Sequence, residues 1–480
     1  MKSSIFTRRG AGRAIAVAVL LYIFCSFIYL SLLGLTNVKI IGTPLSGGTP
    51  LSGKSAGSLS FIWQDNAEHC AGIVETPKAT WLIGYVRDST PGEYTQSLPR
   101  QPFIIDSLLT GYDRKNDITR FADSLSGNSR PTTFVSKLSA EGKFDLVATV
   151  GGTACLQSSP DGASVFLLTD MNLPKGDKDK NTSIDLDQTA VFRSDDQGQN
   201  WRWLRDGLFP QAESIAYAMK PGFYGPQGMW VFGGQTMSQR IDIDHPKKNI
   251  EGVISHSSDL GRTVKTITVP PDMVVPTNDS DDIKRFVFQT SDDRAYAWTS
   301  QSKTENGVCT SAVLELRLHD GHWQAGEMRR DVDVCLSDVK QSSDGRILAM
   351  VYAPNHAALA EWDASNLRWK IGSDLPYLFS PLSGNSSMYG FFVGKQAIVG
   401  RIHSSHALPK WIFWWGETRY ADADATYYSL DSGYSWHPTN LSDFEIVGVG
   451  QITDRLFGYQ YDRRGHVQHD LTLQAFDLSH

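Results

Sequence analysis

The chain has 480 residues, 41% of them hydrophobic and 11% aromatic, which is enough apolar surface for a large core. Its formal net charge is −7, and five of the 45 basic residues but no acidic residue lie within residues 1–39, so that 40 basic residues face 52 acidic residues in the remainder. An acidic chain of this kind is a poor candidate for binding nucleic acid, which requires clustered Lys and Arg.

The N-terminus combines a basic tail with an uncharged stretch. Residues 1–13 carry Lys2, Arg8, Arg9 and Arg13, and no charged residue follows until Lys39. A stretch of this length is long enough for a helix to cross a bilayer, so we predict an uncleaved transmembrane anchor over residues 14–36. The positive-inside rule places the tail in the cytoplasm and the head outside it. The expected location is the periplasm of a bacterial inner membrane, with a lumenal or extracellular type II protein as the alternative.

The next segment differs in composition from everything around it. Residues 37–58 contain the near-duplicate GTPLSGGTPLSG, whose Gly, Pro and Ser content predicts a flexible stalk. The head is then expected to cover residues 59–480. Two polar stretches, near 107–145 and 170–190, are predicted insertions that leave the head as loops or a short helix.

Short apolar runs separated by turn residues fill the head. Runs such as TWLIGYV, ASVFLLT, RILAMVY and TYYSLD are four to eight residues long and rich in β-branched or aromatic side chains. This pattern is typical of strands and predicts an all-β fold.

One octapeptide pattern, Ser-x-Asp-x-Gly-x-x-Trp, occurs twice in full and once in a degenerate form. The full copies are Ser194–Trp201 and Ser429–Trp436, and the third copy, Ser257–Val264, replaces Trp by Val. The Asp accepts backbone hydrogen bonds, Gly supplies a positive φ, and Trp anchors the outgoing strand in apolar surface. The residues that we expect to have this structural role are Ser194, Asp196, Gly198, Trp201, Ser257, Asp259, Gly261, Ser429, Asp431, Gly433 and Trp436.

This pattern resembles the Asp-box, or bacterial neuraminidase repeat, of sialidases and other β-propellers. The three copies begin 63 and 172 positions apart, and 172 is close to three units of about 57 residues. The resemblance therefore implies a β-propeller of about seven blades, with six and eight left open. In that family the Asp-box lies away from the catalytic centre, so it indicates architecture more than activity.

The sialidase resemblance also implies an Arg-Ile-Pro motif near the start of the domain, and this motif is absent. The nearest sequence is Arg100-Gln101-Pro102. No catalytic residue is therefore carried over. We predict a non-catalytic recognition module that binds a protein or a glycan, as a periplasmic receptor, assembly factor or toxin-immunity protein would. The alternative is a sialidase-like exo-glycosidase with its site in the central cavity.

The densest aromatic stretch supplies the candidate binding residues. Residues 410–415 read KWIFWW, and a polar run follows them. A carboxylate, a guanidinium and phenols beside aromatic rings suit a sugar or a protein anchor, whereas packing between blades is the structural alternative. The candidate binding residues are Trp415, Glu417, Arg419, Tyr420 and Tyr427.

Four cysteines remain when Cys25, inside the predicted anchor, is set aside. We predict disulfides Cys309–Cys335 and Cys70–Cys155, with two other connectivities and free thiols as alternatives. No cofactor is predicted. A calcium loop at Asp177–Gln188 is a weak candidate, because it lacks the central Gly and ends in Gln rather than Glu.

Overall fold

The computed structural model describes 22 segments of the chain. They are 16–29, 49–51, 72–86, 132–138, 144–151, 154–159, 161–171, 188–203, 222–224, 228–233, 253–259, 263, 265–273, 282–302, 309–332, 334–353, 356–379, 384–408, 420–439, 441, 444–460 and 473–478.

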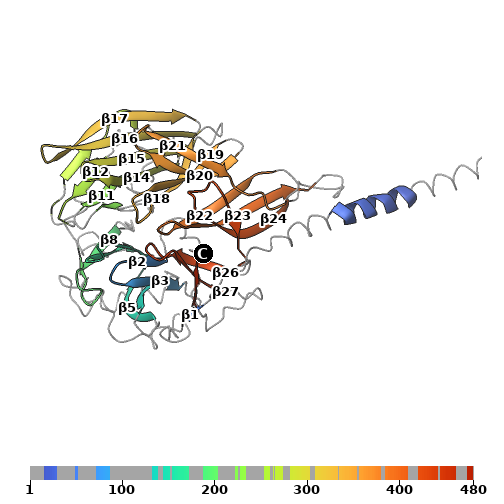
Figure 1. Cartoon of the computed structure of the whole chain (residues 1–480), viewed down its shortest axis with the longest axis horizontal. Coiled ribbons are helices and arrows are strands. Elements are labelled where there is room, and N and C mark those ends of the chain that lie inside the picture. The colour runs from blue at the N-terminus through green and yellow to red at the C-terminus, as the bar shows by residue number, and fades with distance from the viewer. Residues whose placement is uncertain are drawn as a thin grey trace, which may run out of the picture.

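The described strands form seven four-stranded antiparallel sheets arranged around a ring (Figure 1). Sheet 1 consists of β2 (Ile73–Glu75), β3 (Thr80–Val86), β4 (Thr132–Leu138) and β5 (Phe144–Gly151), and sheet 2 of β6 (Ala154–Ser158), β7 (Val165–Met171), β8 (Gln188–Ser194) and β9 (Arg202–Trp203). Sheet 3 consists of β10 (Gly222–Tyr224), β11 (Gly228–Gly233), β12 (Val253–Ser257) and β13 (Lys265–Thr268). Sheet 4 consists of β14 (Asp282–Ser291), β15 (Arg294–Ser302), β16 (Cys309–His319) and β17 (His322–Val332). A 3₁₀ turn, η2 (Pro271–Met273), precedes β14.

Three further sheets complete the ring. Sheet 5 consists of β18 (Cys335–Gln341), β19 (Ile347–Ala353), β20 (His356–Asp363) and β21 (Arg368–Asp374), and sheet 6 of β22 (Ser386–Val393), β23 (Ile398–Ala407), β24 (Tyr420–Ser429) and β25 (His437–Pro438). Sheet 7 consists of β26 (Phe444–Val449), β27 (Arg455–Gln460), β28 (Leu473–Asp477) and, at its outer edge, β1 (Thr49–Leu51).

The first strand of each of several sheets contacts the first strand of the next sheet. These contacts join β2 to β6 and β26, β14 to β10 and β18, and β22 to β18 and β26. The first strands therefore line the middle of the ring, and the last strands lie at its outside. The all-β propeller prediction is confirmed, and the seven described sheets fall within the predicted range of six to eight.

The core lies between neighbouring sheets. One apolar cluster joins Trp298 of sheet 4 to Val351 and Trp362 of sheet 5, and another joins Leu359 of sheet 5 to Phe391 of sheet 6. Central strands such as β19 are apolar along nearly their whole length because both of their faces are covered. Outer strands such as β21 bury one residue, Trp369.

Residues 75 and 451–453, far apart in sequence, close the ring. The Glu75 carboxylate accepts hydrogen bonds from the backbone N–H groups of Ile452 and Thr453 at 2.9 and 2.8 Å. The side chain of Gln451 accepts a hydrogen bond from the Glu75 N–H at 2.6 Å. Sheet 1 is thereby fixed to sheet 7.

Strands of the ring lie within three segments that the sequence set apart as a stalk or as insertions. Strand β1 lies inside the predicted stalk, residues 37–58, and pairs with β28 from Thr49↔Ala475 to Leu51↔Leu473. The predicted insertion at 107–145 contains strand β4 and the start of β5, and the one at 170–190 overlaps the ends of β7 and β8. Local composition missed β1 because its pairing partner, β28, is distant in sequence.

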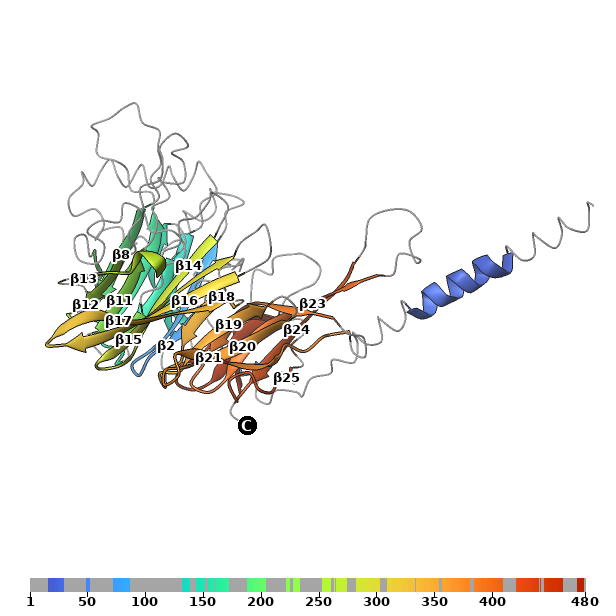
Figure 2. The same cartoon turned by 90° about the horizontal axis from the view of Figure 1, so that it is seen from above.

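A helix over residues 16–29 lies beyond the ring (Figure 2). Within the described ranges, no helix has both the length and the apolar content needed to cross a membrane. The predicted transmembrane helix is therefore not confirmed.

Candidate functional site

The three Ser-x-Asp turns connect the third and fourth strands of sheets 2, 3 and 6. In sheet 6, the Ser429 hydroxyl donates to Asp431 Oδ1 at 2.8 Å and accepts from the Gly433 N–H at 2.8 Å. Asp431 Oδ1 also accepts from the Ser435 N–H at 2.8 Å. The same bonds occur in sheet 2, where Ser194 is bonded to Asp196 and Gly198, and in sheet 3 Ser257 donates to Asp259.

These turns also contact the preceding sheet, which the sequence did not predict. Gly433 has a φ of +88°, and a Cβ atom there would lie 2.8 Å from the Cβ of Leu359 in sheet 5. The Gly433 carbonyl accepts hydrogen bonds from the N–H and hydroxyl of Ser373. Gly198 similarly faces Trp81 of sheet 1. Glycine is therefore required both for the turn and for the close approach of two sheets.

The tryptophans of the pattern anchor the fourth strands. Trp201 is buried in the cluster between sheets 1 and 2, and its indole N–H donates to the Gly198 carbonyl at 3.1 Å. Trp436 packs against the cluster of sheets 5 and 6. Gly261 lies outside the described residues.

The same Ser-to-Asp bond recurs in turns between first and second strands. Here Ser159 donates to Asp161, Ser291 to Asp293, and Ser342 to Asp344. The sequence analysis did not recognise the Ser-to-Asp bond that these three turns share. A search for Ser-x-Asp alone would have found all six turns.

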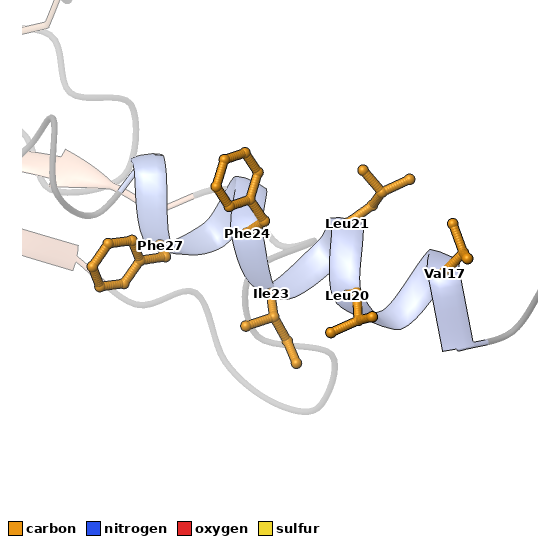
Figure 3. Close-up of a pocket in the computed structure, with 6 residues that line it drawn as sticks. All are labelled: Val17, Leu20, Leu21, Ile23, Phe24 and Phe27. Carbon is orange, nitrogen blue, oxygen red and sulfur yellow. The ribbon is translucent and has the colours of Figure 1, made fainter.

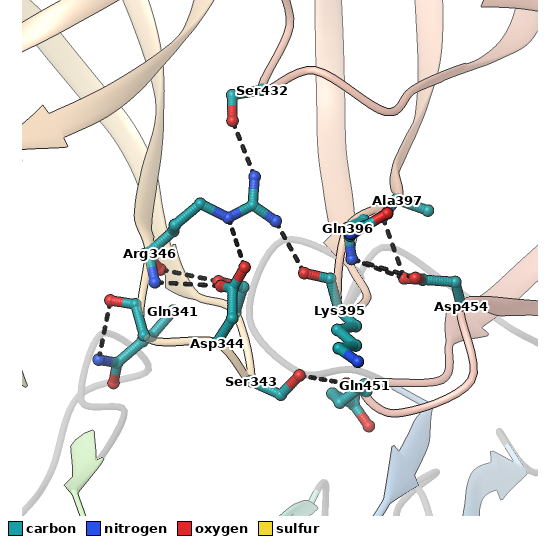
Figure 4. A network of polar contacts seen from close by, with 12 residues as sticks. Gln341, Ser343, Asp344, Arg346, Lys395, Gln396, Ala397, Ser432, Gln451 and Asp454 are labelled. Atoms are coloured by element: carbon teal, nitrogen blue, oxygen red, sulfur yellow. Dashed lines mark hydrogen bonds and ion pairs between the residues drawn. The ribbon is translucent and has the colours of Figure 1, made fainter. Parts of the chain in front are cut away.

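Buried and exposed charges meet where these turns converge (Figure 4). The Arg346 guanidinium donates to Asp344 Oδ2 in its own turn at 2.8 Å, to the Ser432 hydroxyl at 2.8 Å and to the Lys395 carbonyl at 2.7 Å. Asp454 of sheet 7 accepts from the backbone N–H of Gln396 in sheet 6. This network links sheets 5, 6 and 7, and its polar groups are hydrogen-bonded to one another.

The turn carboxylates have shifted acidities. Burial alone would raise the pKa of Asp431, but hydrogen bonds from Ser435 and Ser429 outweigh it and hold the pKa below its usual value. Asp196 behaves in the same way through Asn200 and Ser194. Hydrogen bonds to a carboxylate stabilise its charged form, so these shifts reflect the structural role of the turns.

A second charged group lies at the middle of the ring. Asp338 and Lys340 are on β18, the first strand of sheet 5, and Lys340 Nζ lies 3.0 Å from Asp338 Oδ2. Their side chains are only 8% and 16% exposed. Lys340 also donates to the carbonyl of Phe391, on the first strand of sheet 6, and lies 4.8 Å from that ring's centroid.

A β-bulge positions this pair. The pairing of β18 with β19 shifts between Leu336 and Asp338, so Ser337 is the extra residue. Bulges redirect side chains and occur next to active sites, and burying a charged pair is costly unless its geometry is good. A nearly buried carboxylate at the ring centre is the described group best suited to acid–base or nucleophilic chemistry. We call Asp338 and Lys340 the central ion pair.

Two of the five predicted binding residues, Tyr420 and Tyr427, lie in the described part of the chain. Tyr420 begins β24 and is 58% exposed. Tyr427, on the same strand, is buried in the core between sheets 5 and 6, and burial raises the pKa of its phenol. Tyr427 thus faces the neighbouring sheet, which agrees with the structural alternative of packing between blades. Trp415, Glu417 and Arg419 lie outside the described residues.

Among the cysteines, Cys335 at the start of β18 is disulfide-bonded, and Cys25 on the helix is free and exposed. Strand β16, which begins at Cys309, contacts β18. The Cys309–Cys335 pairing stays a prediction. Cys70, and the calcium candidate Asp177–Asp185, lie outside the described residues, and the side chain of Cys155 is likewise not described. In the described part of the chain no group of His, Cys, Asp and Glu could hold a metal ion.

No family model and no curated protein matches the chain. Solved structures do. Acylaminoacyl peptidase from Pyrococcus horikoshii is 9% identical, with a TM-score of 0.43, over 85% of this chain and 51% of that one. Dipeptidyl peptidase 4 from Porphyromonas gingivalis is 10% identical, with a TM-score of 0.40, over 90% and 61%. A Trypanosoma rangeli sialidase is 9% identical, with a TM-score of 0.33, over 92% and 60%.

These matches correct the predicted function. The similar structures are mostly peptidases and include a sialidase, whereas the sequence had predicted a non-catalytic recognition module. The chain spans about half to three fifths of the length of the three proteins named above. At about one identical residue in ten, they identify no substrate for this chain.

Proposed function

We propose that the chain is a hydrolase held at a membrane, and that it acts on the terminal sugar of a glycan through a site at the middle of the ring. The observation that carries this proposal is the central ion pair. Asp338 is a nearly buried carboxylate on an innermost strand, beside a β-bulge and paired with Lys340 at 3.0 Å.

The pair suits one of the two roles that glycoside hydrolysis requires. Hydrolysis of a glycosidic bond generally uses one group that protonates the leaving oxygen and an ionised group that attacks the sugar or activates water. The ammonium of Lys340 favours the ionised form of a neighbouring carboxylate. We therefore assign Asp338 the role of nucleophile or base and Lys340 that of a positioning residue.

We further propose that the Ser-x-Asp turns are Asp-boxes. Their sequence resemblance and their bonds between third and fourth strands support this assignment, and they build the frame that holds the central strands. The absence of an Arg-Ile-Pro motif argues against the arginine arrangement of sialidases, so the substrate need not carry a carboxylate.

Membrane anchoring rests on the N-terminal segment. The described helix presents large apolar side chains to solvent on several sides, as Figure 3 shows for Val17, Leu20, Leu21, Ile23, Phe24 and Phe27. The uncharged sequence continues on both sides of it, from Ala14 to Val38. Exposed apolar surface of this extent favours lipid. The Cys335 disulfide supports a location outside the cytoplasm.

The test is a substrate panel with the purified full chain in detergent or nanodiscs. It contains sialosides, neutral aryl glycosides, xyloglucan oligosaccharides and aminoacyl and dipeptidyl anilides, with a mock purification as the background. We expect saturable release from at least one glycoside and none from the peptides. Cleavage of peptides alone, or of nothing in the panel, would refute the glycosidase proposal.

A further inference from the structure

The hairpin β23–β24 extends beyond its neighbouring strands. The two strands pair over ten positions, from Ile398↔Ser429 to Ala407↔Tyr420. On one side β22 reaches no further than Ser404, and on the other β25 pairs only with Tyr427 and Tyr428. Residues 405–407 and 420–422 therefore form an overhang of two strands, which we call the hairpin end.

The hairpin end lies beside the end of the apolar helix. The hydroxyl of Tyr29, the last described residue of the helix, is 2.8 Å from Nε2 of His406. The other ring nitrogen of His406 is 2.6 Å from the Tyr377 hydroxyl. Both cartoon views show β23 and β24 projecting from the ring on the side of the helix (Figures 1 and 2).

The chemistry of this end differs from that of the rest of the hairpin. Tyr420 and Ala407, which are paired at its tip, are exposed and uncharged. On the described strands, carboxylates begin two residues further in, with Asp422, and continue with Asp424, whose Oδ1 lies 2.9 Å from Nδ1 of His403. On these two strands the carboxylates thus lie away from the Tyr420–Ala407 pair.

Tyrosine at the end of an apolar helix is typical of a membrane–water interface. The phenol ring suits the boundary because its body is apolar and its hydroxyl is polar. Tyr29 and Tyr420 both lie at this end of the molecule. The sequence that joins the two strands, residues 408–419, contains three of the 13 tryptophans of the chain.

We propose that the hairpin end is a second membrane contact, which rests in the headgroup region of a phospholipid bilayer. This inference rests on the proposed membrane anchoring. The Tyr29–His406 bond would then fix the angle between head and helix, so the head would not swing freely on a stalk. The partner is the lipid surface itself. If the hairpin end instead contacted a second copy of the chain or another protein, quenchers carried by the lipid headgroups would not quench a label placed there.

The test places an environment-sensitive fluorophore at one position at a time in the full chain, reconstituted in phosphatidylcholine vesicles. The positions are native Cys25 on the helix, Tyr420→Cys at the hairpin end, and Asp320→Cys in the turn between β16 and β17 as a distant exposed control. The last two are made in a Cys25→Ser chain, which without an added cysteine gives the background. Nitroxide lipids spin-labelled at the headgroup or deep in the acyl chain act as quenchers.

We expect the acyl-chain nitroxide to quench the fluorescence of the label at Cys25, and the headgroup nitroxide to quench that of the label at Tyr420→Cys several-fold. Neither quencher should act on the label at Asp320→Cys. The replacement His406→Phe should reduce quenching at Tyr420→Cys and leave it unchanged at Cys25. If the Tyr420→Cys label behaves like the Asp320→Cys label while Cys25 is quenched, the hairpin contact is wrong and the anchor stands. If Cys25 is not quenched either, the anchor fails and the inference fails with it.

Discussion

At the residue scale, His256 shows how the packing between sheets sets an ionisation state. Its imidazole is 8% exposed and lies 4.3 Å from the Trp230 ring and 5.7 Å from the Trp323 ring, measured between centroids. Burial, together with the nearby Lys265 and opposed by Asp259, lowers its pKa to about 4. The folded protein therefore holds His256 neutral.

This predicts a specific acid sensitivity. In the unfolded chain His256 titrates near 6.5, so its contribution to stability is complete above that pH and is lost as the pH falls toward 4. The loss is at most about 3 kcal/mol, at roughly 1.4 kcal/mol per pKa unit. Urea unfolding at pH 7 and pH 4.5 should show a smaller loss for His256→Phe than for the wild type.

The control for this prediction is His322→Gln, on the exposed strand β17. It should lose as much stability as the wild type between the two pH values, because its exposed side chain is surrounded by water in both the folded and the unfolded state. Equal pH dependence of His256→Phe and the wild type would show that His256 is not held neutral by the fold.

Local residues could be predicted from the sequence, whereas contacts between sheets could not. Ser429, Asp431 and Gly433 act within eight residues, so their spacing alone identified the turn. The role proposed for Asp338 depends on the position of Lys340, whose ammonium group is bonded to the carbonyl of Phe391 in another sheet. No local sequence pattern reports such a neighbour. The direction of the Tyr427 side chain depends on the register of β24 against β23, which no local pattern reports either.

At the element scale, the Ser-x-Asp turns connect sheets as well as strands. Gly433 and Gly345 both have positive φ, +88° and +90°, but a Cβ on Gly345 would meet no atom within 4 Å. A side chain would cause backbone strain at both positions, but it would collide with a neighbouring sheet only at Gly433.

We expect Gly433→Ala to destabilise the protein more than Gly345→Ala. Each replacement costs about 1–2 kcal/mol for an alanine in the left-handed region. Gly433→Ala adds about 1–3 kcal/mol of overpacking against Leu359. Chemical denaturation of both variants measures the difference, and equal losses would mean that the turn does not support sheet 5.

Strand β1 marks the limit of prediction for elements. Its three residues, Thr-Pro-Leu, repeat those at 43–45 within a segment rich in Gly and Ser, so composition indicated a stalk. Its pairing with β28 depends on more than 400 positions of intervening chain that return to the same place. Such a strand can be identified only when the closed ring of sheets is known.

At the scale of the whole molecule, ring closure brings the ends of the head together. Glu75 and Gln451 join sheet 1 to sheet 7, while β1 supplies the outer strand of sheet 7. The repeated turns allowed the propeller to be predicted from three motifs. The middle of the ring, where Asp338 and Lys340 lie, emerged only from contacts between first strands.

The most direct test of the account compares Asp338→Asn with Asp320→Asn on a glycoside that the wild type hydrolyses. Asp320 is an exposed carboxylate in the turn between β16 and β17, so its replacement controls for the loss of one charge. Because Asp338→Asn leaves Lys340 buried without its carboxylate, the double variant Asp338→Asn, Lys340→Met is measured beside it, with the melting temperature of each.

We predict that kcat falls about 100-fold or more in both Asp338 variants, as expected for loss of a catalytic carboxylate, while at least one of them melts like the wild type. Asp320→Asn should retain full activity. A folded Asp338 variant with the kcat of the wild type would contradict the proposal that hydrolysis takes place at the middle of the ring.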